Sequence, residues 1–509
     1  MKDTKTIRAL LNAGADEAIA LSAPGAAPLT YRSLRSLVDE TVVTLNHLGI
    51  GRGDRVAIVL NNGPTMATTF LGVAAGCASA PLNPAYRADE FEFYLGDLGA
   101  KGLIVEAAST SPAIEVAKKL GIRIIELTAH PERGAGAFVL RSDAVAGAPA
   151  RQPGPAQADD VALVLHTSGT TSRPKIVPLS QTNVWASARN IRTFLELGPG
   201  DRGLNIMPLF HIHGLIAGIT APLSAGGQVC CTSGFNALRF FAWMDEAKPT
   251  WYTAVPTMHQ AILSRAPANR AVIAAHPLRF IRSSSSAMPT QVIRELEEVF
   301  GAPLVESYGM TEAAHQMASN PLPPRARKPG TVGIAAGPEI AIMDPSGRLL
   351  AAGDTGEVVI RGENVTQGYE SNPKANAEAF VDGWFRTGDQ GVLDPQGYLT
   401  ITGRLKEIIN RGGEKVSPRE VDEVLMDHPA VAQVVTFAIP HDKLGEEVGA
   451  AVVLREGSAL TDRELRDFAS TRLADFKVPR KILFLEEIPK GATGKLQRIG
   501  LAQKLGLAD

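Results

Sequence analysis

Short apolar runs alternate with amphipathic helical patterns through the first four fifths of the chain, and this alternation restricts the fold more than any other feature. The runs RVAIVL (55–60) and VALVLHTSG (161–169) are apolar at successive positions, which is typical of buried strands in a parallel sheet. The segment PTQVIRELEEVFG (289–301) predicts a helix that ends at its last glycine, and PLVESYG (303–309) predicts the next strand. The apolar face of the helix would be formed by residues one or two turns apart: Val292, Leu296 and Val299. Strand, helix and strand at this spacing predict an α/β fold with layered elements.

The chain is also too long for one hydrophobic core, because 509 residues exceed the usual size of a single domain. The pattern changes after residues 397–415, where helices such as SPREVDEVLMDH (417–428) begin to alternate with strands such as VAQVVTFAIP (431–440). This part forms an α+β piece of about 100 residues, which is enough for an independent domain. We therefore predict a large N-terminal domain of layered α/β subdomains over residues 1–402 and a small α+β domain over residues 403–509.

Charge and composition argue against several classes of partner. The formal net charge is −2, which gives no reason to expect a nucleic acid or an anionic membrane as partner. No stretch approaches 18 uncharged apolar residues, and the first 21 residues lack the apolar core of a signal peptide. Three cysteines, two of them adjacent, fit neither a disulfide framework nor a zinc site. We expect a cytoplasmic protein that acts on small molecules.

The stretch LHTSGTTSRPKIVPLS (165–180) follows a predicted buried strand and is rich in glycine and hydroxyl residues. Small residues let backbone N–H groups approach a phosphate, and open α/β sheets place ligands after such strands. A flexible surface loop would have the same composition. The stretch is not a Walker A loop, because Lys175 follows Pro174 and precedes Ile176. Spacing alone leaves both interpretations open.

A family resemblance decides between them. TSGTTSRPK (167–175) is similar to the phosphate-binding signature of the ANL adenylate-forming superfamily, which includes acyl-CoA synthetases, peptide-synthetase adenylation domains and beetle luciferases. Ser172 and Ile176 depart from it, because the family usually has glycine at both positions. The resemblance extends from Tyr31 to Arg498, and further segments follow in the family's order: MPLFHIHG (207–214), SYGMTE (307–312), GEVVIRGENVTQGY (356–369), GWFRTGD (383–389), GRLKEIINRGGEKVSP (403–418) and PKGATGKLQR (489–498).

The resemblance implies a two-step reaction that uses ATP, Mg²⁺ and coenzyme A. A carboxylate attacks the α-phosphate of ATP and releases pyrophosphate, and a thiol then displaces AMP from the acyl-adenylate. Mg²⁺ typically takes one protein carboxylate plus phosphate oxygens, and Glu312 is the candidate. A carboxylate at a helix N-terminus, favoured by the helix dipole, is the structural alternative for Glu312.

The matched motifs also imply which residues hold the nucleotide. Asp389 would accept both ribose hydroxyls and Arg404 would add a donor, whereas an exposed turn aspartate is the alternative for Asp389. The remaining nucleotide-binding candidates lie in the matched motifs: Thr167, Ser168, Gly169, Thr170, Thr171, Lys175, Ser286, Ala287, Tyr308, Gly309 and Thr311.

Lys495 in GATGK would bridge the attacking carboxylate and the α-phosphate as charge shifts between them, although a C-terminal lysine is more often a solvated charge. Lys495 lies in a loop of small residues, which we expect to be flexible. Movement of the whole small domain would therefore bring this lysine to the site. Lys406 matches the family's hinge position. After adenylation, rotation would withdraw Lys495 and bring the segment with Gly413 and Lys415 to the site, where the glycine leaves room for the pantetheine arm of coenzyme A.

Three rival functions are less well supported by the residues. Amino-acid adenylation domains carry an early aspartate for the substrate ammonium, whereas MPLFHIHGL has two histidines and no acid. The sequence does not exclude luciferase-type oxygenation, but thiol-accepting ligases are far commoner. A catalytically silent nucleotide-binding protein would be expected to lose Lys495 or Glu312, and both are present.

MPLFHIHG (207–214) resembles the family segment that places an aromatic or histidine residue beside the acyl pocket. This segment and the others that line the pocket in the family are unusually polar here, which bears on the substrate. Each polar residue also has a structural alternative. Arg282 could extend from a strand end to solvent, the serines at 283–286 could form a turn, and a single histidine is more often structural than a ligand contact. Several donors in one pocket nevertheless suit a second carboxylate, whose burial needs paired hydrogen bonds or cations. We predict a short dicarboxylate, oxalate before malonate. Among the ligases, the chain most resembles oxalate–CoA ligases in six segments: TSGTTSRPK (167–175), MPLFHIHGL (207–215), TWYTAVPTMHQ (250–260), RFIRSSSSAM (279–288), MTEAAHQMASNPLP (310–323) and INRGGEK (409–415). The alternatives are a medium-chain fatty acid or a 4-coumarate-type acid. The candidate residues beside the acyl group are His211, His213, Arg282, Ser285 and His315.

Overall fold

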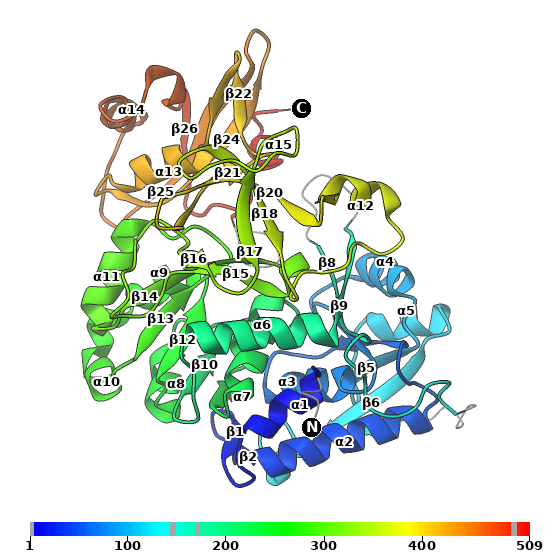
Figure 1. Cartoon of the computed structure of the whole chain (residues 1–509). Coiled ribbons are helices and arrows are strands. Elements are labelled where there is room, and N and C mark those ends of the chain that lie inside the picture. The colour runs from blue at the N-terminus through cyan, green and yellow to red at the C-terminus, as the bar shows by residue number, and fades with distance from the viewer. Residues whose placement is uncertain (1–4, 143–148, 168–173, 490–495, 509) are drawn as a thin grey trace.

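The computed structural model describes residues 5–142, 149–167, 174–489 and 496–508. In these ranges the strands form four sheets, two large ones covered by helices and two smaller ones (Figure 1). The predicted α/β architecture, with a large N-terminal part and a smaller C-terminal part, is confirmed. Within the same ranges, no helix is both long enough and apolar enough to cross a membrane.

One large sheet contains the strands predicted at residues 55–60 and 161–169. Its described strands, in spatial order, are β7 (Phe138–Arg141), β6 (Arg123–Ala129), β5 (Gly102–Glu106), β3 (Arg55–Val59), β4 (Ala78–Pro81), β8 (Val161–His166) and β9 (Ile176–Ser180). Strand β3 is parallel to both neighbours, as predicted, whereas β8 is parallel to β4 and antiparallel to β9. The helices of this part are α2 (Tyr31–His47), α3 (Pro64–Ala74), α4 (Ala88–Leu98) and α5 (Ala113–Lys119). Because β8 and β9 form a hairpin, the glycine- and hydroxyl-rich loop is the connection between them.

The second large sheet carries the polar acyl-pocket segments at its strand ends. Its described strands, in spatial order, are β16 (Ile334–Ala335), β15 (His315–Ser319), β14 (Leu304–Met310), β13 (Phe280–Ser283), β12 (Trp251–Ala254), β10 (Arg202–Asn205), β11 (Gln228–Cys231), β1 (Ile19–Ser22) and β2 (Leu29–Thr30). Its helices are α6 (Gln181–Phe194), a π-helix (His213–Thr220), α7 (Ala221–Ser224), α8 (Phe240–Ala247), α9 (Pro256–Leu263), α10 (Arg270–Ala275) and α11 (Thr290–Phe300). The central strands β10 to β14 are mutually parallel, so their carboxyl ends share one edge.

The helix predicted at residues 289–301 is α11, and it ends at Gly301 in the left-handed conformation. The predicted apolar face was wrong at one position, because Val299 is 38% exposed. Phe300 and Ile293 are buried instead. The helix therefore turns a face centred one residue away from the predicted one toward the sheet.

A third sheet leads from the N-terminal part to the C-terminal part. It contains β17 (Glu339–Met343), β18 (Thr355–Arg361), β20 (Trp384–Leu393), β19 (Phe380–Val381) and β21 (Leu399–Arg404), with α12 (Pro373–Ala379) beside it. The fourth sheet contains β23 (Glu414–Val416), β22 (Ile409–Arg411), β25 (Gly445–Leu454), β24 (Val431–His441) and β26 (Lys481–Phe484), with α13 (Pro418–Met426), α14 (Asp462–Ser470) and α15 (Leu501–Lys504). The chain passes between these sheets over residues 405–408. The domain division at residue 402/403 stays a prediction.

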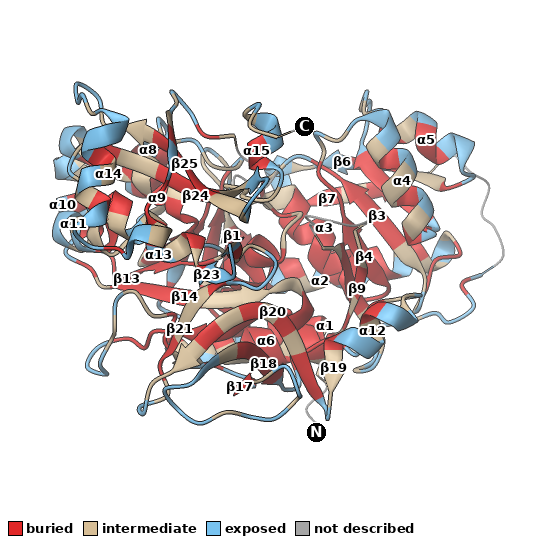
Figure 2. Ribbon diagram, turned by 90° about the horizontal axis from the view of Figure 1, so that it is seen from above, coloured by how far each residue is buried: buried red, intermediate tan, exposed pale blue. Residues whose placement is uncertain are grey.

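The hydrophobic core lies between the sheets and their helices. Seen from above, the strands are mostly buried and the outer faces of the helices are exposed (Figure 2). The C-terminal sheet has a core of its own, built from residues such as Ile409, Val421 and Leu465. Such a separate core is expected of a part that folds as a unit.

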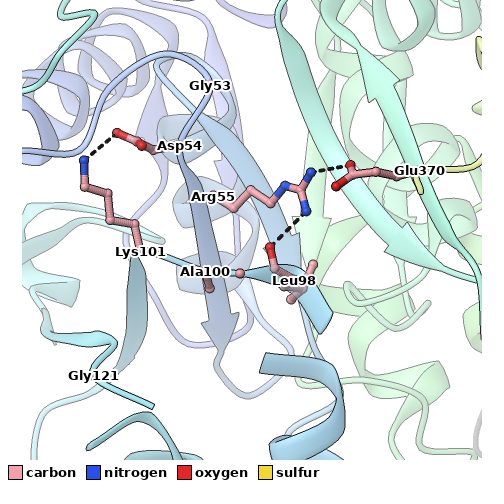
Figure 3. A pocket seen from close by; sticks show the side chains of 9 residues that line it. Gly53, Asp54, Arg55, Leu98, Ala100, Lys101, Gly121 and Glu370 are labelled. Atoms are coloured by element: carbon pink, nitrogen blue, oxygen red, sulfur yellow. Dashed lines mark hydrogen bonds and ion pairs between the residues drawn. The ribbon is translucent and has the colours of Figure 1, made fainter. Parts of the chain in front are cut away.

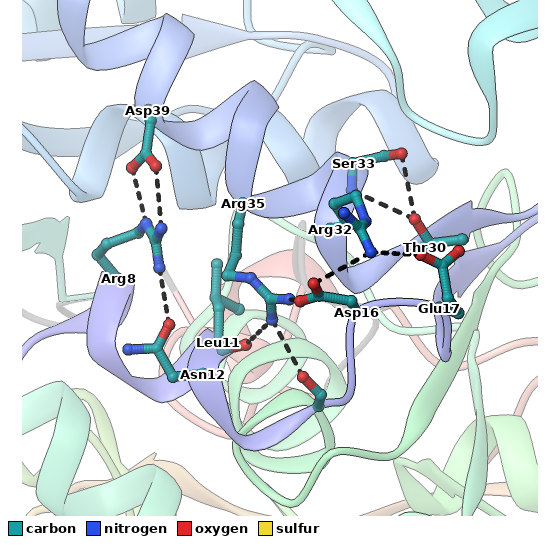
Figure 4. A network of polar contacts seen from close by, with 11 residues as sticks. Arg8, Leu11, Asn12, Asp16, Glu17, Thr30, Arg32, Ser33, Arg35 and Asp39 are labelled. Atoms are coloured by element: carbon teal, nitrogen blue, oxygen red, sulfur yellow. Dashed lines mark hydrogen bonds and ion pairs between the residues drawn. The ribbon is translucent and has the colours of Figure 1, made fainter.

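The start of the described chain is fixed to α2 by arginine side chains (Figure 4). Arg35 of α2 donates to the carbonyl oxygens of Leu11 at 2.9 Å and Gly14 at 3.1 Å, and it pairs with Asp16. These carbonyl groups lie in and just after the 3₁₀-helix Leu11–Ala13 that follows helix α1 (Ile7–Leu10), and carbonyl groups at helix ends lack intrahelical donors. The arginine supplies those donors and docks the first helix on the domain.

Candidate active site

Two hydrogen bonds between Thr167 and Lys175 close the base of the candidate phosphate loop. The Thr167 N–H donates to the Lys175 carbonyl oxygen at 3.0 Å, and the Lys175 N–H donates to the Thr167 hydroxyl at 3.2 Å. Four predicted phosphate-binding residues of this loop, together with Ser172, lie outside the described residues: Ser168, Gly169, Thr170 and Thr171. Their phosphate contacts therefore stay predictions, while the two ends of the loop are fixed.

The ribose candidate Asp389 lies in β20 between two other predicted nucleotide residues. The Tyr308 hydroxyl donates to one carboxylate oxygen of Asp389, and Arg404 Nε donates to the other at 2.9 Å. Asp389 is 8% exposed, which does not fit the alternative of an exposed turn aspartate. Burial, together with the neighbouring carboxylate, raises the pKa of Tyr308, so its hydroxyl keeps its proton and remains a donor. The attraction of Asp389 also raises the pKa of Arg404.

The metal candidate Glu312 lies in a three-residue 3₁₀-helix, Thr311–Ala313. So short a helix has no appreciable dipole, which removes the structural alternative for this carboxylate. Glu312 is 6% exposed, and burial raises its pKa. Its Oε1 accepts a hydrogen bond from the Tyr369 hydroxyl at 2.8 Å. A buried carboxylate of this kind gains from a cation beside it.

Tyr369 was not predicted as a site residue, although its segment was matched to the family. The Lys175 ammonium lies 4.3 Å from the centroid of the Tyr369 ring. The tyrosine therefore contacts both the residue that closes the loop and the metal candidate Glu312. A tyrosine that follows a glycine is too common a pair to be selected from one sequence.

The predicted substrate residue Arg282 lies in β13, and its side chain is fully buried. One terminal nitrogen is 3.2 Å from His213 Nε2 and 3.2 Å from the Thr253 hydroxyl. The other is 3.0 Å from His315 Nε2 and 3.3 Å from Gln316 Oε1. Among the described residues, no carboxylate pairs with this guanidinium. Burial lowers the pKa of Arg282 to about 9, so the side chain is still cationic at pH 7. The alternative, in which it extends to solvent, is wrong.

The arginine determines which nitrogen of each histidine carries the proton. A guanidinium only donates, so the Nε2 atoms of His213 and His315 accept, and in neutral rings the proton then lies on Nδ1. In that tautomer His213 Nε2 also accepts from the Thr253 hydroxyl at 2.7 Å, and Nδ1 donates to the Ser285 hydroxyl oxygen at 3.1 Å. That leaves the hydroxyl hydrogen of Ser285 available for an acceptor. The two imidazole rings stack with centroids 4.8 Å apart.

Two residues of this cluster have backbones that non-glycine residues rarely adopt. Ser285 has φ of 74° and His315 has φ of 99°. Such conformations persist where surrounding contacts fix them, and they concentrate at functional sites. Gly309 allows His315 to approach, because a Cβ atom there would lie 1.7 Å from the His315 carbonyl oxygen. The acyl-pocket cluster is thereby joined to the strand that carries Tyr308.

Ser286 and Ala287 are exposed and line a cavity of about 140 Å³ between the N-terminal part and the C-terminal part. From the C-terminal part, Arg419 and Leu496 also line it. Lys495, the predicted catalytic lysine, immediately precedes Leu496 but lies outside the described residues.

Other predicted residues lie apart from this cluster or at its edge. The His211 ring is tilted against Phe210, with centroids 4.6 Å apart. Lys406 is exposed in the turn between β21 and β22. Gly413 and Lys415 are exposed in the hairpin of β22 and β23, where Gly413 has φ of 100°. The roles predicted for these residues remain predictions.

A larger cavity, of about 590 Å³, lies elsewhere (Figure 3). It opens beside Arg55 at the start of β3 and Lys101 just before β5, so it lies at the amino ends of parallel strands. Arg55 pairs with Glu370, and Lys101 pairs with Asp54 at 3.0 Å. Its charges therefore compensate one another, and it contains none of the predicted site residues.

Comparisons with known proteins identify the family of the chain. A family model described as AMP-binding enzyme matches residues 11–370, and one described as AMP-binding enzyme C-terminal domain matches residues 420–495. An oxalate–CoA ligase of Arabidopsis thaliana is 45% identical, with 95% of both chains covered. An oxalate–CoA ligase of Saccharomyces cerevisiae is 42% identical, with 93% of this chain and 92% of that protein covered. The crystal structure of ATP-bound MatB from Rhodopseudomonas palustris superposes with a TM-score of 0.87 at 28% identity, covering 99% of this chain and 98% of that one. The chain belongs to the AMP-binding enzyme family, the adenylate-forming superfamily that its motifs indicated.

Proposed function

We propose that the chain is an ATP-dependent acid–CoA ligase that acts on a short dicarboxylate, oxalate before malonate. In the first step, a carboxylate oxygen of the acid attacks the α-phosphorus of ATP, and the bond to pyrophosphate breaks. In the second step, the thiol sulfur of coenzyme A attacks the acyl carbon, loses its proton, and AMP leaves. Both relatives described above carry the name oxalate–CoA ligase, which supports this reaction class.

The nucleotide would be held by residues that the fold brings together. Asp389 would accept the ribose hydroxyls, in place of part of its present bonding to Tyr308 and Arg404. The loop that Thr167 and Lys175 close would face the phosphates. Backbone N–H groups and hydroxyls are suited to that contact.

Glu312 would be the protein ligand of Mg²⁺. Among the described residues, no three histidine, cysteine, aspartate or glutamate side chains gather into a metal cage. Mg²⁺ bound with a nucleotide usually takes one or two carboxylates and completes its shell with phosphate oxygens and water. A single buried carboxylate therefore fits the donor set, and the ion would neutralise phosphate charge as the substrate approaches.

The observation that carries the substrate assignment is the buried, uncompensated charge of Arg282. A buried cation without a carboxylate is unfavourable by several kcal/mol, and an anionic ligand beside it removes that penalty. Because Arg282 is fully buried, the ligand would be contacted by donors around it, above all the Ser285 hydroxyl. The pocket for a fatty acid would instead be lined by apolar and aromatic side chains.

We also propose that two orientations of residues 403–509 serve the two steps. Lys495 would enter for adenylation, Lys406 would absorb the rotation, and the hairpin with Gly413 and Lys415 would then face coenzyme A. The change of sheet over residues 405–408 supports a hinge there. The cavity between the two parts supports a separable contact.

Exchange of labelled pyrophosphate into ATP tests the proposed function. Exchange should require Mg²⁺ and oxalate, and adding coenzyme A should then yield AMP and one thioester per ATP consumed. If no acid supports exchange, the chain is a silent nucleotide-binding protein. If exchange occurs without thioester formation, it forms adenylates but is not a CoA ligase.

A further inference from the structure

Tyr369 lies between the two groups proposed to handle the phosphates and the cation. It is 8% exposed and follows β18 in the chain. Its hydroxyl donates to Glu312 Oε1 at 2.8 Å, and its ring lies 4.3 Å beneath the Lys175 ammonium. A hydrogen bond to a charged acceptor and a cation–π contact are both stronger than contacts between neutral groups. One side chain therefore orients a carboxylate through its edge and an ammonium through its face.

The backbone around Tyr369 is itself fixed. The Tyr369 N–H donates to Asn376 Oδ1 at 2.7 Å, and Asn376 Nδ2 donates back to the Tyr369 carbonyl at 2.8 Å. The N–H of the next residue, Glu370, donates at 3.1 Å to the carbonyl of Ile176, the first residue of β9. The ring therefore cannot shift without breaking contacts to α12 and to the strand that follows the phosphate loop.

A second connection holds the same segment to Glu312. The Thr366 N–H donates to the Glu312 carbonyl at 2.7 Å, and the Thr366 hydroxyl donates to the Pro178 carbonyl of β9 at 2.8 Å. Residues 366–370 thus join the end of the phosphate loop to the short helix that carries Glu312. Hydrogen bonds therefore hold this segment on both sides of the site.

We propose that Tyr369 is a positioning residue that aims the Glu312 carboxylate at the nucleotide-bound cation and holds the Lys175 ammonium in place. This inference rests on the proposed function. The hydroxyl occupies one lone pair of Oε1, so it limits the rotations of the carboxylate that would turn it from the site. The ring acts separately, through Lys175, on the phosphates alone.

Tyr398 offers a matched control. It is also 8% exposed, the Lys328 ammonium lies 4.4 Å from its ring centroid, and its hydroxyl donates to a backbone carbonyl, that of Ala326. The two tyrosines therefore share burial and a cation–π contact. They differ in the group that the hydroxyl contacts.

Calorimetric binding of ATP without acid or coenzyme A tests the proposal on the whole chain, because no turnover occurs. We expect Tyr369→Phe to bind ATP in EDTA within about twofold of the unchanged protein, but to lose about tenfold in affinity for Mn²⁺·ATP, as for a hydrogen bond to a charged group. Tyr369→Leu should weaken ATP binding in EDTA as well, because Lys175 loses the ring. Tyr398→Phe should change neither affinity.

The outcomes distinguish a failure of the role proposed for Tyr369 from a failure of the proposed function. If the unchanged protein binds ATP more tightly with Mn²⁺ but Tyr369→Phe does the same, Tyr369 does not position Glu312 and the inference fails alone. If Tyr398→Phe loses the same metal-dependent affinity, the effect is a general loss of stability, and the inference fails again. If the unchanged protein binds no ATP at all, the proposed function fails.

Discussion

At the scale of single residues, the charge balance around Arg282 is the most informative feature of the chain. Four neutral side chains accept from or contact its guanidinium, and none of them compensates its charge. A buried ion without a partner costs several kcal/mol, and we propose that an anionic substrate removes this cost.

The catalytic proposal at this scale concerns Lys495. We expect Lys495→Ala to lower pyrophosphate exchange by at least about 10²–10³-fold, the scale for losing one preorganised charge-stabilising group. Thioester formation from supplied acyl-adenylate should persist, because the lysine is withdrawn for that step. Lys504→Ala, at the exposed end of α15, is the control and should leave both steps unchanged. An equal loss in both half-reactions for Lys495→Ala would refute the two-orientation proposal.

Sequence reasoning placed Arg282, His213, Ser285 and His315 in one pocket, and the fold brings these four together. It did not find Thr253 or Gln316, which complete the hydrogen bonding of the guanidinium. Both are ordinary strand residues, and only the pairing of β12, β13 and β15 in one sheet makes them neighbours. A single sequence does not indicate which residues of distant strands are paired in a sheet.

At the scale of elements, apolar pattern was sufficient to predict strands β3, β8, β14 and β24 and helices α11 and α13. The pattern did not reveal that β8 forms an antiparallel hairpin with β9. A buried strand has the same apolar sequence pattern whether its neighbour is parallel or antiparallel. Val299 was misplaced for a related reason. The sequence has two adjacent apolar residues at the end of α11, Val299 and Phe300, and the structure buries Phe300.

The hinge between β21 and β22 gives a prediction at this scale. Lys406→Pro fixes φ near −65°, so the turn can no longer adopt both backbone conformations. We expect one half-reaction to remain near normal and the other to fall sharply, measured as pyrophosphate exchange and as thioester formation from acyl-adenylate. Lys406→Ala removes the same charge but leaves φ free, and it should support both. Full overall activity of the proline variant would exclude Lys406 as the hinge.

At the scale of the whole molecule, Glu306 is a buried carboxyl of the N-terminal part near Arg419 of the C-terminal part. It is 5% exposed in β14, it accepts from the Gly330 N–H at 3.1 Å, and burial raises its pKa to about 8 despite nearby Arg419 of α13. A carboxyl whose folded pKa exceeds its unfolded value of about 4.5 favours the folded state fully at low pH. That contribution is lost as the pH rises from about 4.5 through about 8.

Glu306→Gln should therefore gain stability relative to the unchanged protein as the pH rises. The amide oxygen still accepts from Gly330 but does not ionise. We expect the difference in melting temperature between variant and unchanged protein to grow by several degrees from pH 5 to pH 8. Glu298→Gln, at an exposed position of α11, should show a constant difference. A constant difference for Glu306→Gln too would mean that this carboxyl is ionised throughout.

We propose that the site selects an acid with a second carboxylate, and steady-state kcat/KM for coenzyme A consumption measures this selectivity. The acids compared are oxalate, malonate, acetate, hexanoate and 4-coumarate; acetate matches oxalate in carbon number but lacks the second charge. We predict the highest kcat/KM for oxalate, with malonate next and the three monocarboxylates below both. Arg282→Met should reduce the ratio of oxalate to acetate by at least about tenfold. A higher kcat/KM for hexanoate or 4-coumarate than for oxalate would contradict the account and identify a fatty or aromatic acid ligase.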